Sequence, residues 1–195
     1  MKLTTFALAI AAFVAPLGAT AQPAPATGTQ TMGSGMSSTP AARTGMSASG
    51  ARTAARGDRT FVQKAAEGDE KEIALSRVAL EKSSDDNIKR FAQMMVDDHT
   101  KAGDELKQIS SAQGMAPSGD PKAKADAAAS KLRSLSGAAF DRQYVQTMTT
   151  DHAATVKLFQ TEARSGSNAD LKGFAEKTLP TIQAHYDEVR GMKKR

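Results

Sequence analysis

The chain has 195 residues, of which 39% are apolar, 24% charged and 5% aromatic, and its formal net charge is +5. This length suits one domain of ordinary size with a terminal segment, and it is too short for two large domains. The absence of cysteine excludes disulfides, thiolate-bound zinc, iron–sulfur clusters and a thiol nucleophile.

The first 21 residues predict a secretory signal peptide. Lys2 supplies a positive charge, residues 3–17 form an apolar stretch, and residues 19–21 form a small-residue cleavage site. The apolar stretch is too short to span a bilayer comfortably, and no later segment is longer, so we expect no transmembrane segment in the mature chain. After cleavage near Ala21 the protein is expected to be periplasmic or secreted.

Residues 22–57 form a segment of low complexity. They are rich in Ala, Ser, Thr, Gly and Pro and contain almost no large apolar side chain except methionine. Such a composition buries too little surface to offset the entropy of ordering, so we expect a disordered tail. The folded domain is then expected to cover residues 58–195.

Helix signals divide this domain into long helices joined by short turns. Thr60 and Gln63 fit a capping box, which predicts that a first helix begins at Thr60 and ends near Lys82. Ser83–Asp86 then provide an N-cap for a second helix that ends at Gln113, before a glycine. Further helices are predicted over residues 121–135, 138–165 and 169–192. No segment has the signals of a β-strand, so the predicted class is all-α.

Apolar residues in the four long helices recur at alternating spacings of three and four. In the second long helix this stripe comprises Ile88, Ala92, Met95, His99, Ala102, Leu106 and Ile109. Stripes of this kind on helices joined by short turns are typical of an antiparallel four-helix bundle. The connection between the second and third long helices is the one long connection.

The candidate site consists of the three histidines of the chain and one glutamate, each on the stripe of a different long helix. These residues are Glu72, His99, His152 and His185. Counted from the two short turns, they lie roughly 20–25 Å along the bundle, so their side chains are expected to converge. Three imidazoles and a carboxylate suit a single divalent or copper ion. A hydrogen-bonded network without metal, in which Glu72 holds the imidazoles, is the alternative.

Three segments carry a resemblance to a known family. They are FVQKAAEGDEKEIALSRVALEKSSDDNIKRFAQMMVDDH, GAAFDRQYVQTMTTDH and LKGFAEKTLP, the last followed by His185. Over roughly residues 61–192 the chain resembles domain-of-unknown-function family 4142. The resemblance implies an exported, ferritin-like four-helix protein of bacteria, and it implies no activity. The chain lacks the Glu-x-x-His pairs of ferritin-like di-iron sites, because Val96, Thr149 and Ile182 stand three residues before the histidines.

Three functions remain open from the sequence. The first is a non-enzymatic bundle of the cell envelope with a role in stress tolerance or metal handling. The second is a metal-binding or metal-dependent redox protein that uses the Glu/His set, and the third is an envelope interaction module whose basic tail binds anionic surfaces. No catalytic motif is present, and no basic stripe with interleaved aromatics indicates nucleic-acid binding. The sequence does not specify a partner or an oligomeric state.

Overall fold

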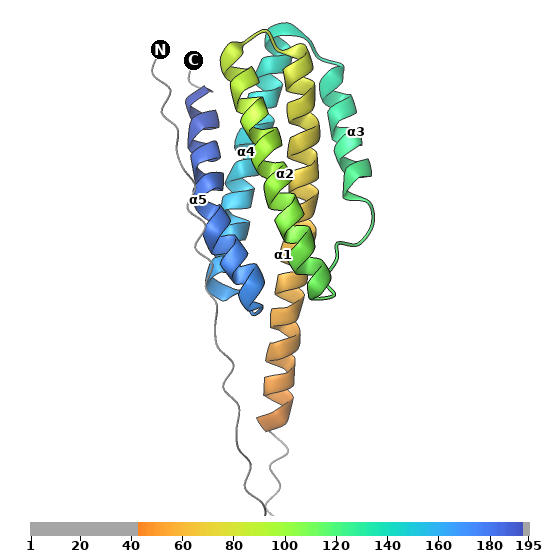
Figure 1. Ribbon diagram of the computed structural model, residues 1–195, viewed down its shortest axis with the longest axis vertical. Coiled ribbons are helices and arrows are strands. Elements are labelled where there is room, and N and C mark those ends of the chain that lie inside the picture. Colours follow the sequence, from red (N-terminus) through yellow and green to blue (C-terminus); the bar gives the residue numbers. More distant parts are fainter. Residues whose placement is uncertain (1–42, 193–195) are drawn as a thin grey trace, which may run out of the picture. The chain divides into compact units, whose positions relative to one another are not determined.

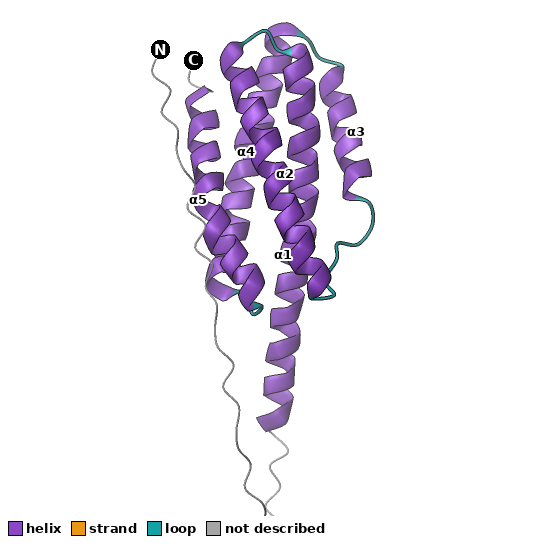
Figure 2. Ribbon diagram, in the orientation of Figure 1, coloured by secondary structure: helices purple, strands orange, loops and turns teal. Residues whose placement is uncertain are grey.

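A computed structural model describes residues 43–192, with side chains from residue 55 onward. The predicted signal peptide and residues 22–42 of the predicted tail lie outside the described residues. The described chain forms five helices and no strand: α1 (Arg43–Lys82), α2 (Asp86–Ala112), α3 (Pro121–Arg133), α4 (Gly137–Ser165) and α5 (Ala169–Met192) (Figure 2). The prediction of an all-α protein is therefore confirmed for this part of the chain.

Helices α1, α2, α4 and α5 lie side by side, and α3 packs on the outside of α1 (Figure 1). Helix α1 contacts α2 and α4, and α5 contacts the same two helices, so each long helix has two long neighbours. Those neighbours run antiparallel (Figure 1). Because α2 ends at one end of this arrangement and α4 begins at the other, α3 and the loops on either side of it carry the chain back.

Most helix ends follow the capping residues that the sequence contains. The Asp85 carboxylate accepts hydrogen bonds from the Asn87 and Ile88 amides at the start of α2. The Asn168 side chain accepts from Asp170 N and Leu171 N at the start of α5. Gly114, after α2, has a φ of 62°, a conformation that glycine adopts without strain. Short polar turns thus set where these helices begin and end.

The start of α1 differs from the prediction. The helix begins at Arg43, so residues 43–57, which were assigned to the tail, are helical, and Thr60 does not cap it. The Thr60 hydroxyl instead donates to the Arg56 carbonyl at 2.9 Å, as a threonine inside a helix does. Once a helix is nucleated by packing, each added residue gains a hydrogen bond, and alanine and arginine favour this propagation.

The residues just before Thr60 also pack against the rest of the domain. Asp58 is 2% exposed, and its carboxylate accepts from the backbone amides of Ser167 and Asn168 in the turn between α4 and α5. The middle of α1 is therefore fixed to the far end of the α4–α5 hairpin.

The core has two apolar halves. One contains Phe91, Tyr144 and Met148, and the other contains a group of ring contacts among Phe61, Phe159 and Phe174. Between the halves lies a layer of buried polar side chains, which comprises Asp69, Glu72, His99, His152 and His185. A polar layer inside an apolar core is costly unless its groups find partners, so these residues are the candidates for function.

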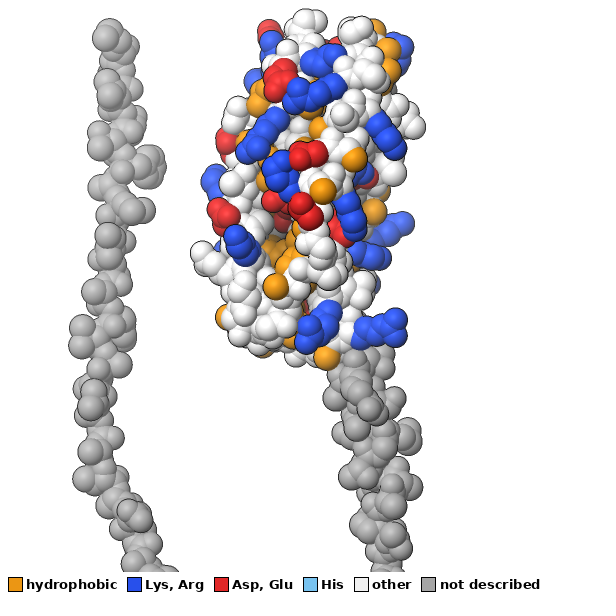
Figure 3. Space-filling model, turned by 90° about the vertical axis from the view of Figure 1, so that its right-hand side faces the viewer, with side chains coloured by type: hydrophobic (Ala, Val, Ile, Leu, Met, Phe, Trp, Pro, Cys, Tyr) orange, Lys and Arg blue, Asp and Glu red, His pale blue; other side chains and the backbone are white. Residues whose placement is uncertain are grey.

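The described helices and one face of the surface bear on membrane and nucleic-acid binding. No helix in the described range is both long enough and apolar enough to cross a membrane. On the face drawn in Figure 3, Lys and Arg side chains are interspersed with Asp and Glu, and hydrophobic side chains are scattered among them. This face therefore does not carry the basic stripe that binding to nucleic acid requires.

Candidate metal centre

The four predicted site residues meet in the polar layer, one from each long helix. Glu72 lies on α1, His99 on α2, His152 on α4 and His185 on α5, and their exposed fractions are 2%, 4%, 0% and 2%. The imidazole rings form a nearly equilateral triangle with centroids 5.6 to 5.7 Å apart. One nitrogen from each ring lies within 4.8 Å of the other two. The predicted convergence is confirmed, and the bound metal stays a prediction.

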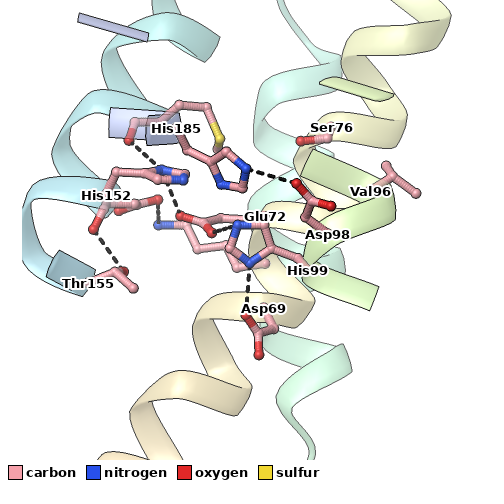
Figure 4. Close-up of polar contacts among 12 residues, drawn as sticks. Asp69, Glu72, Ser76, Val96, Asp98, His99, His152, Thr155 and His185 are labelled. Carbon is pink, nitrogen blue, oxygen red and sulfur yellow. Dashed lines mark hydrogen bonds and ion pairs between the residues drawn. The ribbon is translucent and has the colours of Figure 1, made fainter. Parts of the chain in front are cut away.

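Each histidine has one ring nitrogen held by an acceptor at the edge of the layer (Figure 4). His99 Nδ1 donates to Asp69 Oδ1 at 2.8 Å, and His185 Nε2 donates to Asp98 Oδ2 at 3.1 Å. His152 Nδ1 donates to the Met148 carbonyl, one turn earlier in α4, at 3.0 Å. Because a carbonyl or a carboxylate can only accept, each of these nitrogens carries the proton. The tautomers of His152 and His185 are fixed in this way.

The other ring nitrogens are those left for a ligand. His152 Nε2 and His185 Nδ1 are buried and have no hydrogen-bond partner in the described part of the chain. In neutral imidazoles with the opposite nitrogen protonated, these two atoms carry lone pairs. A buried lone pair without a donor is uncommon in proteins and calls for an explanation such as a bound ion.

Glu72 lies in the centre of the cluster and touches two of the imidazoles (Figure 4). One carboxylate oxygen is 3.0 Å from His99 Nε2, and the other is 3.2 Å from His152 Nδ1. Asp69 Oδ2 is also buried and has no hydrogen-bond partner in the described part of the chain. The layer thus holds acceptors in excess of donors, which favours the binding of a cation.

Burial and mutual charge separate the pKa values of the four groups. Burial raises the pKa of Glu72 to about 7, although the charge on His99 opposes this. Burial would lower the pKa of His99, but the carboxylates of Glu72 and Asp69 outweigh it and raise the value to about 9. Burial, together with the charge on His99, lowers the pKa of His152 to about 3 and of His185 to about 4. Two neutral imidazoles therefore face one protonated imidazole at neutral pH.

Two residues that hold the histidines were not identified from the sequence. Asp98 is not part of the apolar stripe of α2, yet its partly exposed carboxylate reaches His185 on α5. Asp69 lies three residues before Glu72 on the same face of α1, and that spacing is the signal that could have found it. Asp151 pairs with Lys71 at 2.7 Å, and Glu162 lies beside Asp58, so neither joins the cluster.

The walls of the site are aromatic on one side. The Phe91 ring lies 6.4 Å from the His152 ring and 6.5 Å from the His185 ring, measured between centroids. Phe91 also packs against Tyr144, whose hydroxyl lies 2.9 Å from Ser76 Oγ. These contacts exclude water from one side and hold the rings of two histidines in place.

The fold and the site define a helical domain with a buried Glu/His cluster between two apolar halves of its core. The profile of the DUF4142 family, described as a domain of unknown function, matches residues 43–192, and the chain belongs to this family. The match begins at the first residue of α1 and ends at the last residue of α5.

The fold has a counterpart among solved structures. The crystal structure of a DUF305 fragment from Deinococcus radiodurans superposes with a TM-score of 0.61, covering 71% of this chain and 96% of that chain. The two sequences are 17% identical, so the likeness concerns the fold alone. No curated protein matches the chain.

Proposed function

We propose that this protein is an exported, ferritin-like four-helix protein that holds one transition-metal ion at His99, His152 and His185, with Glu72 as a fourth ligand. The observation that carries the proposal is the pair of buried nitrogens, His152 Nε2 and His185 Nδ1, that have no donor within a triangle of imidazoles. Imidazole nitrogen suits zinc, copper, iron and nickel in their divalent states.

The outer contacts of the histidines support this proposal. Metal-binding histidines usually donate their second N–H to a carboxylate or a backbone carbonyl, which fixes the ring and its tautomer. All three histidines do so here, to Asp69, Asp98 and the Met148 carbonyl. A core network without metal would not need the same arrangement three times.

The geometry requires a modest contraction before an ion is bound. Bonds of about 2.0–2.1 Å in a tetrahedral site place donor nitrogens about 3.3 Å apart. The nitrogens of the three rings lie within 4.8 Å of one another, so small side-chain rotations bring them to bonding distance. A cation also replaces the second proton of His99, which now faces Glu72.

The donor set favours one ion over two. Among the described residues, Glu72 is the one carboxylate in contact with two of the histidines, while Asp69 and Asp98 each hold a single imidazole from outside. A di-iron site of the ferritin-like type needs four carboxylates and two histidines, with two Glu-x-x-His pairs. The histidines are at most 4% exposed, which suits holding an ion rather than turning over a substrate.

The test is metal binding by the untagged protein. After treatment with a chelator and dialysis, Co²⁺, Zn²⁺ and Cu²⁺ are added separately, and bound metal is measured by elemental analysis. We expect one ion per chain for at least one of the metals and none for His152→Phe. Tyr144→Phe is the matched control, because Tyr144 is as deeply buried on the same helix and lies outside the ligand set. Absence of binding to the native protein, or equal binding by His152→Phe, contradicts the proposal.

Export is a separate part of the proposal and rests on the composition of residues 1–21. Expressed in a Gram-negative bacterium, the protein should appear in the periplasmic fraction with Gln22 as its first residue. N-terminal sequencing that finds Met1 in that fraction would contradict the assignment of a cleaved signal.

A further inference from the structure

The Glu/His cluster is nearly sealed, so an ion needs a path to reach it. Two surface clefts in the described part of the chain include residues of the cluster in their walls. The α1–α2 cleft, about 570 Å³, is lined by Asp69 and His99. The α1–α4 cleft, about 470 Å³, is lined by Glu72. The charged side chains that line the two clefts differ in their ion pairs. This difference decides which cleft suits a cation.

Among the described residues, the α1–α4 cleft is lined by no unpaired carboxylate outside the Glu/His cluster, because Glu67 is paired with Lys124 and Asp151 with Lys71. Lys71 forms an ion pair of 2.7 Å with Asp151, and both residues line the cleft together with Glu72. Lys64 and Lys157 line the same cleft. A divalent ion that approaches Glu72 from this side meets ammonium groups, and it has to break the pair between Lys71 and Asp151.

The α1–α2 cleft presents a carboxylate oxygen instead. Asp69 Oδ1 accepts from His99, whereas Asp69 Oδ2 is buried and has no hydrogen-bond partner. The residue is 8% exposed, so this oxygen is an unpartnered acceptor at the inner end of the cleft. Glu70 and Asp104 line the cleft nearer to solvent, and its lysine Lys122 is paired with Asp126 at 2.6 Å. Arg77 and Lys107 complete the charged lining.

Gly103 packs against Asp69 in the wall of the α1–α2 cleft. A Cβ atom at Gly103 would lie 3.7 Å from Asp69 Oδ2, which is ordinary van der Waals contact. Position 103 therefore tolerates a methyl group, and a large side chain there would fill the cleft beside Asp69. The α1–α4 cleft contains a glycine of its own, Gly68, at which a Cβ atom would contact nothing within 4 Å.

We infer that divalent cations reach the histidines through the α1–α2 cleft, and that Asp69 Oδ2 is their first protein ligand on the way in. This inference rests on the proposed metal site. Asp69 connects entry of the ion with its binding at the histidines. The same carboxylate that receives the ion also holds His99, the one histidine that lines the cleft. A path of this kind sets the rates of binding and release without setting the affinity.

The experiment measures the kinetics of Co²⁺ binding by the full mature chain. Association is followed by stopped-flow absorbance, and release is followed after addition of excess chelator. In Gly103→Leu we expect both rates to fall at least tenfold by the same factor, so that Kd stays within about twofold of the native value. Gly68→Leu, the matched control in the other cleft, should keep native rates.

A pair of charge reversals provides a second measurement with little risk to folding. Asp104→Lys, at the exposed rim of the cleft, should slow association several-fold at low salt and less at high salt, because screening weakens the repulsion. Asp97→Lys, exposed on the same helix and absent from the cleft lining, should have a smaller effect.

Each outcome separates the path from the site. Native rates in both Gly103→Leu and Asp104→Lys, or equal slowing by Gly68→Leu, overturn the path while leaving the metal site intact. A changed Kd in Gly103→Leu with unequal changes in the two rates also overturns it, since the substitution then acts on the site. No Co²⁺ binding to the native protein at equilibrium overturns the proposed function and the path together.

Discussion

Replacement of His99 by leucine tests whether the polar layer stabilises the domain in the absence of metal. The substitution removes the partner of Asp69 Oδ1 at 2.8 Å and of Glu72 Oε2 at 3.0 Å. Both carboxylates remain buried, with exposed fractions of 8% and 2%. Removal of one member of a buried ion pair costs about 3–5 kcal/mol, because the remaining charge has no compensation.

Burial of the leucine side chain offsets part of this loss in the free energy of unfolding. It fills a similar volume between two apolar halves, and burial of its methylene groups contributes about 1 kcal/mol more than the imidazole does. We therefore expect His99→Leu to lose about 2–4 kcal/mol of the free energy of unfolding at pH 7.5 with chelator present. For a domain of this size, this corresponds to a fall in Tm of roughly 5–15 °C.

The assay is urea unfolding followed by far-UV circular dichroism, with Met95→Leu as control. Met95 is fully buried on the same face of α2, and a swap that conserves volume costs less than about 1.5 kcal/mol. Addition of Glu72→Gln to His99→Leu should restore at least half of the loss, since a neutral amide no longer buries a charge. A free energy of unfolding for His99→Leu within 0.5 kcal/mol of the native value, or no recovery in the double variant, would refute this reasoning.

Three further predictions concern other buried contacts. Burial and the charge on Asp58 raise the pKa of Glu162 to about 7, so its contribution to stability is complete below pH 4.5 and is lost as pH rises through 7. In thermal melts, Glu162→Gln should therefore gain roughly 1–2 kcal/mol over the native protein between pH 5 and pH 8, after allowance for solvent around this carboxyl, and a constant difference would contradict this. Gly166→Ala should lose roughly 1–3 kcal/mol, because the added Cβ would lie 2.6 Å from the Glu162 carbonyl oxygen, whereas Gly191→Ala, with open space, should lose none. Tyr144→Phe should cost about 1 kcal/mol in urea unfolding by removing the 2.9 Å contact with the Ser76 hydroxyl, and an unchanged midpoint would show that this contact contributes nothing.

Hydrophobic periodicity predicted much of the fold, because it reports which face of a helix is buried. The interior positions of His99, His152 and His185 follow from it, and so does their common level, since short turns fix how far each residue lies from a helix end. The same reasoning failed at Thr60, where a local capping signal was outweighed by propagation of α1 toward Arg43.

Contacts between helices were beyond this kind of prediction. Asp98 lies beside the buried stripe of α2 and not on it, and its contact with His185 depends on how α2 is rotated relative to α5. A repeat of three and four residues gives the buried face of one helix, and it gives neither the rotation nor the distance between two. The proposal of a metal site rests on which ring nitrogens lack partners, and sequence spacing does not contain that information.

The segment between α2 and α4, which runs back along α1, sets a minimum number of residues for this domain. Helix α2 has 27 residues and is about 40 Å long, and α4 begins at its opposite end. Even a fully extended linker, at about 3.3–3.6 Å per residue, needs about 12 residues to cover that length. Helix α3, whose 13 residues span about 20 Å, covers about half of that length as a rigid element, and the loops on either side of it cover the rest. It also places Ala129 and Leu132 over the core. A flexible replacement of adequate length would keep the order of the helices and leave that side of α1 open to water. Attempts to engineer a smaller version should therefore shorten the turns and keep α3.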